Sequence, residues 1–310
     1  MMTPLPSLRQ LQHLVALSEQ VHFGRAAEAC FITQSSLSAS IKELENVLGA
    51  VLVERTKRSV QFTALGLQVA DRARTILSET GDLVDLVQAA AAPLSGGLRL
   101  GVIPTISPFL LPRLLPTLRQ AYPDLRLYLR EEQTTRLLEQ LAAGDLDVLL
   151  LAFPYPMAKT ATEVFAEDPF LVAFSRTHPF AGRERITTAD LAGENLLLLE
   201  DGHCLRDHAL AACGLATLQG EKGFQGTSLH TLVQMVDNGL GLTLLPKMAV
   251  DGGIIRGTKI AVRPLDGPAP GRQIGLAWRK TSPRTGELKL LGNIFRDELA
   301  MPVRPSRRLD

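Results

Sequence analysis

The segment Thr33-Gln34-Ser35-Ser36-Leu37-Ser38-Ala39-Ser40-Ile41-Lys42-Glu43-Leu44-Glu45 decides the fold of the amino-terminal part of this chain. Threonine is favourable immediately before a helix, so we expect a helix with Thr33 as its N-cap. Its apolar residues recur at the spacing of one buried helical face, at Leu37, Ile41, Leu44 and Leu48. The opposite face carries slim side chains that can approach DNA base edges closely: Gln34, Ser35, Ser36, Ser38, Ala39 and Lys42.

Two helices are expected before this segment and two short strands after it. Apolar residues from Leu8 indicate the first helix, and the alanine-rich run 25–30 indicates a short second one, which together give a helix-turn-helix order. Residues 51–54 and 60–62 predict strands joined by a wing with three basic residues, Arg55, Lys57 and Arg58. We therefore expect residues 1–62 to form an all-α winged helix-turn-helix domain that binds double-stranded DNA. The alternative is a small helical bundle with a solvated basic loop.

A long helix is expected next, and we assign residues 63–96 to a linker and dimerisation helix. A long helix with one apolar stripe needs a partner, and the simplest partner is the same helix of a second subunit. Pro93-Leu94-Ser95-Gly96-Gly97 then ends the helix and marks the clearest domain boundary. The stripe consists of Leu65, Val69, Ala73, Ile76, Leu77, Leu83, Val84 and Val87.

The remainder, residues 97–310, alternates short apolar runs with helical patterns, which predicts an α/β sheet with parallel strands. We expect two lobes arranged as in periplasmic binding proteins, with lobe I formed by 97–167 and 269–300 and lobe II by 168–268. The cleft between them is the expected place for a small molecule. The predicted protein is therefore multidomain, although this architecture alone does not separate a sensor from an enzyme or a solute-binding protein.

Composition excludes several classes of protein. The formal net charge is +1, so nucleic-acid binding must rest on the local placement of basic groups. No apolar run reaches the roughly eighteen residues of a membrane span, and the start lacks the pattern of a secretory signal, so we expect a cytoplasmic protein without membrane contact. The 3 cysteines argue against a framework of structural disulfides and leave burial, metal binding or redox chemistry.

Cys204 and Cys213 are nine residues apart. In one helix they would be separated by about 13.5 Å of rise and lie on opposite faces, whereas a disulfide needs Cα atoms within about 7 Å. The pair can therefore bridge only if the segment refolds. Backbone N–H groups in a first helical turn favour a Cys204 thiolate, and His203 and Arg206 add nearby donors.

A zinc site is the competing interpretation of this segment. It would use His203, Cys204, His208 and Cys213, but two adjacent residues cannot easily ligate one tetrahedral ion, so we expect no metal. Five histidines are expected to lie at the surface or to cap helices: His13, His22, His178, His208 and His230.

The chain resembles the LysR-type transcriptional regulators over essentially its whole length. The resemblance rests on 23–27 and 33–45, which look like that family's DNA-reading helices, and on 52–56, which looks like its wing. Within the family the chain is similar to peroxide sensors, through Gly202-His203-Cys204-Leu205-Arg206-Asp207 with Cys213 at the matching interval. Residues 227–229 and 241–246 extend that similarity.

The resemblance implies that Cys204 reacts with hydrogen peroxide and that Cys213 resolves the product into an intramolecular disulfide. It also places Thr105, Thr134 and Arg272 around the reactive sulfur, where hydroxyls could hold peroxide and the cation could stabilise developing charge. The implied protein is a homotetrameric activator of antioxidant genes, with no cofactor and no enzymatic turnover. Its implied partners are an operator, RNA polymerase and a thiol reductant of glutaredoxin or thioredoxin type.

Two alternatives remain open at this point. One is a LysR-type regulator that senses a small metabolite in the interlobe cleft, with incidental cysteines. The other is a thiol-peroxidase-like enzyme fused to a DNA-binding domain.

Overall fold

The computed structural model describes residues 5–55, 60–213, 225–266 and 271–300. The chain divides into two compact units, one of Met1–Val87 with Ala143–Asp145 and the other of Gln88–Ala142 with Leu146–Asp310. Within the described ranges, no helix combines the length and the apolar character needed to cross a membrane.

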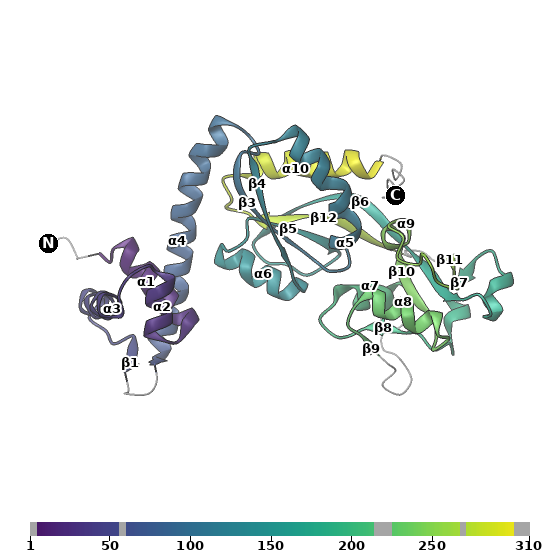
Figure 1. Cartoon of the computed structure of the whole chain (residues 1–310), viewed down its shortest axis with the longest axis horizontal. Coiled ribbons are helices and arrows are strands. Elements are labelled where there is room, and N and C mark those ends of the chain that lie inside the picture. Colours follow the sequence, from purple (N-terminus) through teal and green to yellow (C-terminus); the bar gives the residue numbers. More distant parts are fainter. Residues whose placement is uncertain (1–4, 56–59, 214–224, 267–270, 301–310) are drawn as a thin grey trace. The chain divides into compact units, whose positions relative to one another are not determined.

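The first unit begins with three helices, α1 (Leu8–Gln20), α2 (Phe23–Ala29) and α3 (Gln34–Leu48) (Figure 1). As predicted, Thr33 is the N-cap of α3, and its hydroxyl accepts a hydrogen bond from the backbone N–H of Ser36 at 3.2 Å. The predicted apolar face is buried in the core of this unit, except for its last residue, Leu48, which is exposed.

The wing consists of strands β1 (Val53–Arg55) and β2 (Val60–Phe62), which pair antiparallel. The carboxylate of Glu45, on α3, accepts hydrogen bonds from the backbone N–H groups of Leu52 at 2.8 Å and Val53 at 3.1 Å. This carboxylate fixes the base of the wing to α3. Arg55 ends β1, whereas Lys57 and Arg58 lie outside the described residues.

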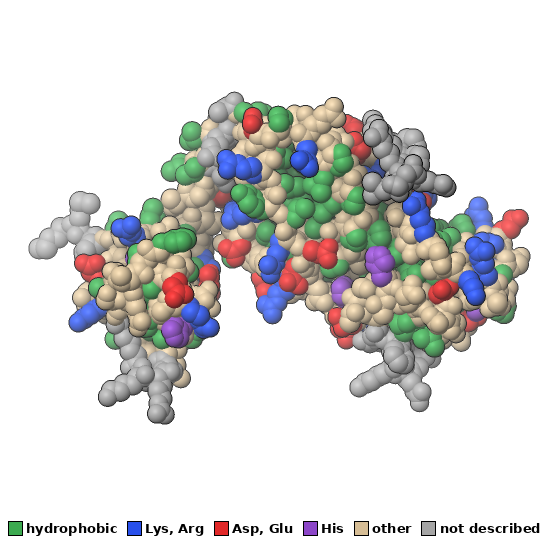
Figure 2. Space-filling model, in the orientation of Figure 1, with side chains coloured by type: hydrophobic (Ala, Val, Ile, Leu, Met, Phe, Trp, Pro, Cys, Tyr) green, Lys and Arg blue, Asp and Glu red, His purple; other side chains and the backbone are tan. Residues whose placement is uncertain are grey.

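Helix α4 (Ala64–Ala91) follows the wing. Its first half packs into the core of the unit, where Ala70 and Ala73 are buried. Further along the helix, Leu83, Val84 and Val87 are exposed, and apolar side chains reach the surface there (Figure 2). The first half of the predicted apolar stripe therefore packs against the first unit's own core, and its last residues form an exposed apolar surface.

Lobe I of the second unit has the predicted α/β order, and strand β3 pairs in parallel with both β4 and β5. Strand β5 is buried along its whole length, which fits its uninterrupted apolar sequence. The last helix of the chain packs against α5 (Figure 1). The elements are β3 (Gly96–Val102), α5 (Ser107–Ala121), β4 (Leu125–Glu131), α6 (Thr134–Ala143), β5 (Val148–Phe153) and α10 (Thr285–Ala300).

The rest of the sheet is mixed rather than parallel, and among the described strands only β7 (Ile186–Thr187) and β11 (Ile260–Asp266) at its far edge pair in parallel there. Strand β12 (Gly271–Arg279) is antiparallel to both β5 and β6 (Thr160–Ser175). The second half of β6 continues into lobe II, where β10 (Thr243–Pro246) and β11 (Ile260–Asp266) pair with it, also antiparallel. These antiparallel pairings join segments far apart in the sequence, since β6 and β12 are separated by most of lobe II.

The remaining elements belong to lobe II. They are η1 (Pro179–Gly182), β7 (Ile186–Thr187), η2 (Ala189–Leu191), β8 (Leu198–Leu199), α7 (Cys204–Ala212), β9 (Gln225–Gly226), α8 (Leu229–Asp237) and α9 (Lys247–Asp251). Each lobe has its own apolar core, and α7 contributes to both of them. Cys204 lies in the lobe I core, whereas Leu205, Ala209 and Cys213 lie in the lobe II core.

The cap of α3 gives a test of how the reading helix is held. Replacing Thr33 by alanine removes the acceptor for the Ser36 N–H, so we expect the free energy of unfolding of the first unit to fall by about 1 kcal/mol. Urea denaturation followed by circular dichroism measures the change. Thr33→Ser keeps the hydroxyl and should restore most of the loss, and equal stability of all three chains would contradict the capping role.

Candidate functional site

Cys204 begins α7, and only 4% of its surface is exposed. The turn before it depends on Gly202, whose φ of +97° is strained for any residue with a Cβ. A Cβ at this glycine would also lie 2.7 Å from Oε1 of Gln133. The loop that leads to Cys204 is therefore packed closely against the residue that precedes α6.

Helix α7 keeps the two cysteines apart. Cys213 is the C-cap of the helix that Cys204 begins, so the predicted geometry of opposite faces is present. Both thiols are free and buried, one in the core of lobe I and the other in the core of lobe II. A bond between them requires at least part of α7 to unwind.

Arg272 is 1% exposed, and each of its three guanidinium nitrogens donates a hydrogen bond. Its Nε donates to Asp168 Oδ2 at 3.0 Å, and its two terminal nitrogens donate to the hydroxyl of Thr105 at 2.8 Å and to the Thr105 carbonyl at 3.0 Å. Asp168 also accepts a bond from the backbone N–H of Met248 at 2.8 Å. Because the Thr105 oxygen accepts from Arg272, its own hydroxyl hydrogen can be donated to another oxygen atom.

Thr134 is the first residue of α6 and is buried. Its hydroxyl has no partner with full hydrogen-bond geometry among the described residues, yet it is close enough to Cys204 to stabilise the thiolate. A buried hydroxyl without a full partner is costly, so the site is suited to a small polar molecule that can supply the missing bond.

Burial and nearby polar groups shift the pKa of the Cys204 thiol in opposite directions. Burial is the largest effect and raises the pKa of its thiol, while the Thr134 hydroxyl and then the charge of Arg272 lower it. Burial raises the pKa of Cys213 to about 11, with no donor opposing it. Among the described residues the two thiols therefore differ in chemistry: the thiolate of Cys204 has stabilising neighbours and that of Cys213 has none.

His203 and Arg206, the other predicted members of the site, lie at the start of α7. His203 is buried, its Nε2 is 3.9 Å from Glu200 Oε1, and burial lowers its pKa against the opposing charge of Glu200. Nε of Arg206 is 3.0 Å from Asp201 Oδ1, and its Nη1 donates to the Leu199 carbonyl at 3.2 Å. Arg206 thus ties the turn to β8, and its charge is balanced by Asp201.

Sequence prediction missed Asp168 and assigned His208 wrongly. His208 is 8% exposed rather than at the surface, and its Nε2 lies 2.8 Å from the carbonyl oxygen of Pro154. The helical spacing of four from Cys204 was an available signal, whereas nothing in the sequence singles out Asp168. His13 is also buried, 2.7 Å from Ser40 Oγ, because it belongs to the core-facing side of α1.

The other histidine expectations are correct: His22 caps α2, His178 caps η1 and His230 is exposed. No cluster of histidine, cysteine and carboxylate side chains suited to a metal ion is present among the described residues.

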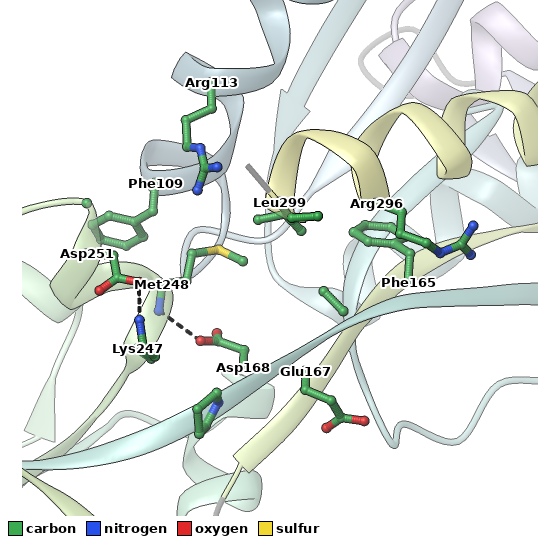
Figure 3. A pocket seen from close by; sticks show the side chains of 14 residues that line it. Phe109, Arg113, Phe165, Glu167, Asp168, Lys247, Met248, Asp251, Arg296 and Leu299 are labelled. Carbon is green, nitrogen blue, oxygen red and sulfur yellow. Dashed lines mark hydrogen bonds and ion pairs between the residues drawn. The ribbon is translucent and has the colours of Figure 1, made fainter. Parts of the chain in front are cut away.

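A separate pocket of about 360 Å³ lies near the passage of β6 between the lobes. Figure 3 shows Phe109, Met248 and Leu299 around it, with Asp168 at its floor, hydrogen-bonded to the backbone of Met248. Asp168 therefore belongs both to the wall of this pocket and to the Arg272 network.

The polar face of α3 is at the surface. Gln34, Ser35, Ser36, Ala39 and Lys42 are exposed, and Ser38 is half-buried. The sequence-predicted DNA face is thus accessible where the structure describes it.

Two family models match the chain. Residues 8–67 match the bacterial regulatory helix-turn-helix protein of the lysR family, and residues 91–300 match the LysR substrate binding domain. The chain belongs to the LysR family of bacterial transcriptional regulators.

Relatives within this family carry a narrower description. The chain is 43% identical over 290 residues to the DNA-binding transcriptional dual regulator OxyR of Escherichia coli K12, covering 94% of this chain and 95% of that one. It resembles the structure of full-length OxyR from Pseudomonas aeruginosa with a cysteine-to-aspartate substitution, with a TM-score of 0.77, 35% identity and coverage of 94% and 95%. A hydrogen-peroxide-bound cysteine-to-serine mutant of OxyR from Corynebacterium glutamicum gives a TM-score of 0.64, 32% identity and coverage of 96% and 94%.

The buried pair of Arg272 and Asp168 makes a stability prediction. Replacing Asp168 by alanine leaves a buried guanidinium without its carboxylate, which we expect to lower the free energy of unfolding by about 3–5 kcal/mol. The control is Asp266→Ala, which removes the exposed partner of Arg185 and should cost less than about 1 kcal/mol. Thermal denaturation of the dithiol form compares them, and similar losses for both variants would refute the special role of Asp168.

Proposed function

We propose that this protein is a DNA-binding transcriptional regulator that senses hydrogen peroxide through Cys204 and controls antioxidant genes. The observation that carries the proposal is the placement of Cys204 at the start of α7, beside Thr134 and under the charge of Arg272. Relatives named as hydrogen peroxide-inducible genes activators, and the peroxide-bound OxyR structure, support it.

The proposed chemistry begins with attack of the Cys204 thiolate on one peroxide oxygen. The O–O bond breaks, the sulfur becomes a sulfenic acid, and the departing hydroxide takes a proton and leaves as water. Thr105 and Thr134 would orient the peroxide, and Arg272 with the Thr105 hydroxyl would stabilise charge on the departing oxygen. His203 and Arg206 would hold the turn that presents Cys204.

The second step joins the two cysteines. The Cys213 sulfur attacks the sulfenic sulfur, the S–O bond breaks, and a second water is released as the disulfide forms. Because α7 holds the cysteines on opposite faces, closure requires the helix to unwind. A full switch between two forms takes about 5.5 kcal/mol of differential stability, which the redox free energy of the disulfide would supply.

The remaining parts of the proposal concern assembly and partners. Residues Gln34, Ser35, Ser36, Ser38, Ala39 and Lys42, with Arg55, Lys57 and Arg58 of the wing, would contact the operator. The exposed apolar part of α4 supports pairing with a second copy, and we propose a tetramer. We further propose a cytoplasmic location, contact with RNA polymerase, reduction by a glutaredoxin- or thioredoxin-type dithiol, and no catalytic turnover.

We also propose the domain boundaries expected from the sequence, with the DNA-binding domain ending at residue 62 and the regulatory domain beginning at residue 97. The compact units separate at residue 87, because the first half of α4 packs into the core of the first unit.

The raised pKa of Cys204 predicts how the reaction depends on pH. Below that pKa the thiolate fraction rises about tenfold per pH unit, so the second-order rate of oxidation by peroxide should rise with the same slope between pH 6.5 and about pH 8. Stopped-flow mixing followed by acid quench and mass spectrometry measures it. Thr134→Val removes a group that lowers the pKa and should slow the reaction at every pH, whereas a rate independent of pH would contradict this account.

The sulfur itself is tested by substitution. Cys204→Ser should leave operator binding intact and abolish the peroxide-dependent change in the DNA footprint, because no sulfenic acid can form. Mass spectrometry after a brief peroxide pulse should detect a Cys204–Cys213 crosslink in the natural chain. A Cys204→Ser protein that still responds normally would exclude the proposed sulfur.

The pocket beside Asp168 favours one second candidate, a LysR-type regulator that binds a small metabolite. A thermal shift with small carboxylates, together with no response to peroxide, would support that candidate over the first.

A further inference from the structure

We propose that His208 is a positioning residue that holds α7 in its dithiol conformation and makes formation of the Cys204–Cys213 disulfide sensitive to mild acid. This inference rests on the proposed disulfide switch and adds a residue and a second signal to it.

The contact that carries the proposal joins α7 to lobe I. His208 Nε2 lies 2.8 Å from the carbonyl oxygen of Pro154, in the segment directly after β5. A carbonyl can only accept, so Nε2 carries the hydrogen and Nδ1 of the neutral ring is left with its lone pair. That Nδ1 is buried and has no hydrogen-bond partner among the described residues.

The position of His208 on the helix links this contact to the switch. It follows Cys204 by four residues, so both side chains lie on the face of α7 that meets lobe I. The opposite face, with Leu205 and Cys213, belongs to the lobe II core. The unwinding that we propose extends through His208, so that it breaks the bond to Pro154 and exposes the ring to water.

The surroundings of His208 disfavour a positive charge on its ring. Burial is the largest effect and lowers its pKa, and the positive charge of Arg272, on β12, lowers it further. The Pro154 contact and Asp207, on α7 itself, oppose this change, while Asp168 balances the charge of Arg272. A proton added at Nδ1 would find no acceptor among these groups.

The pKa of His208 differs between the dithiol form and the unwound form, and this difference decides whether acid favours the disulfide. In the dithiol form the pKa of His208 is lowered, and in the unwound form the exposed ring should return to about 6.5. Protons therefore bind more readily to the unwound form below about pH 6.5, and acid shifts the equilibrium toward the disulfide. At pH 7.5 both forms are neutral and the shift is absent.

The experiment equilibrates the full chain with glutathione and its disulfide, which exchange two electrons and two protons as the protein cysteines do. Without another titrating group, the equilibrium constant for protein oxidation is the same at pH 5.5 and pH 7.5. Acid quench, alkylation and mass spectrometry give the fraction of Cys204–Cys213 crosslink.

Three variants make the result specific. His208→Gln keeps an N–H donor for Pro154 but cannot titrate, and His208→Ala loses both properties. His203→Gln provides a background without the other buried histidine near the sulfur, because burial lowers its pKa as well.

We expect the oxidation constant of the natural chain, divided by that of His208→Gln, to increase from pH 7.5 to pH 5.5 with or without His203, by about tenfold at the upper limit set by an unwound-form pKa of about 6.5. At pH 7.5, His208→Ala should favour the disulfide about fivefold over His208→Gln, because it lacks the anchoring bond. A ratio that does not change with pH, in chains that do form the crosslink, overturns the His208 proposal alone. Absence of the crosslink in the natural chain overturns the disulfide switch and this proposal together.

Discussion

The regulatory unit depends on one constraint of helix geometry. Nine residues of regular helix turn Cys213 to the side opposite Cys204, and the two lobes bury these opposite sides in separate apolar cores. Helix α7 is thus stabilised by packing against both lobes, and a disulfide between its two cysteines is incompatible with that packing. Oxidation of one buried atom can therefore be converted into a rearrangement of a much larger surface, because no small adjustment relieves the conflict.

Much of this organisation could be predicted from the sequence, for identifiable reasons. The N-cap at Thr33 and the apolar face of α3 follow from local preferences, and both agree with the structure apart from the exposed Leu48. The direction of β12 and β6 could not be predicted, because strand pairing over more than one hundred residues leaves no local trace. Asp168 was missed for the same reason: what marks it is the distant Arg272, not its neighbours in the chain.

The candidate site shows how burial and polarity are balanced. Each guanidinium nitrogen of Arg272 donates a hydrogen bond and Asp168 balances its charge, so the charge is tolerated in the interior. Thr134 and His208, in contrast, each retain a buried polar atom without a full partner. Unpartnered buried atoms destabilise the dithiol conformation, which is acceptable in a helix that has to unwind when the protein is oxidised.

The continuity of β6 has a consequence for how a signal can travel. Its first half is bonded to β12 up to Pro169 and its second half to β10 from Phe170 onward, so the partner strand changes between two adjacent residues. Because neither partner crosses this junction, bending of one lobe against the other along β6 is confined to it. Helix α7, which contributes to the apolar cores of both lobes, is therefore an element that resists such bending.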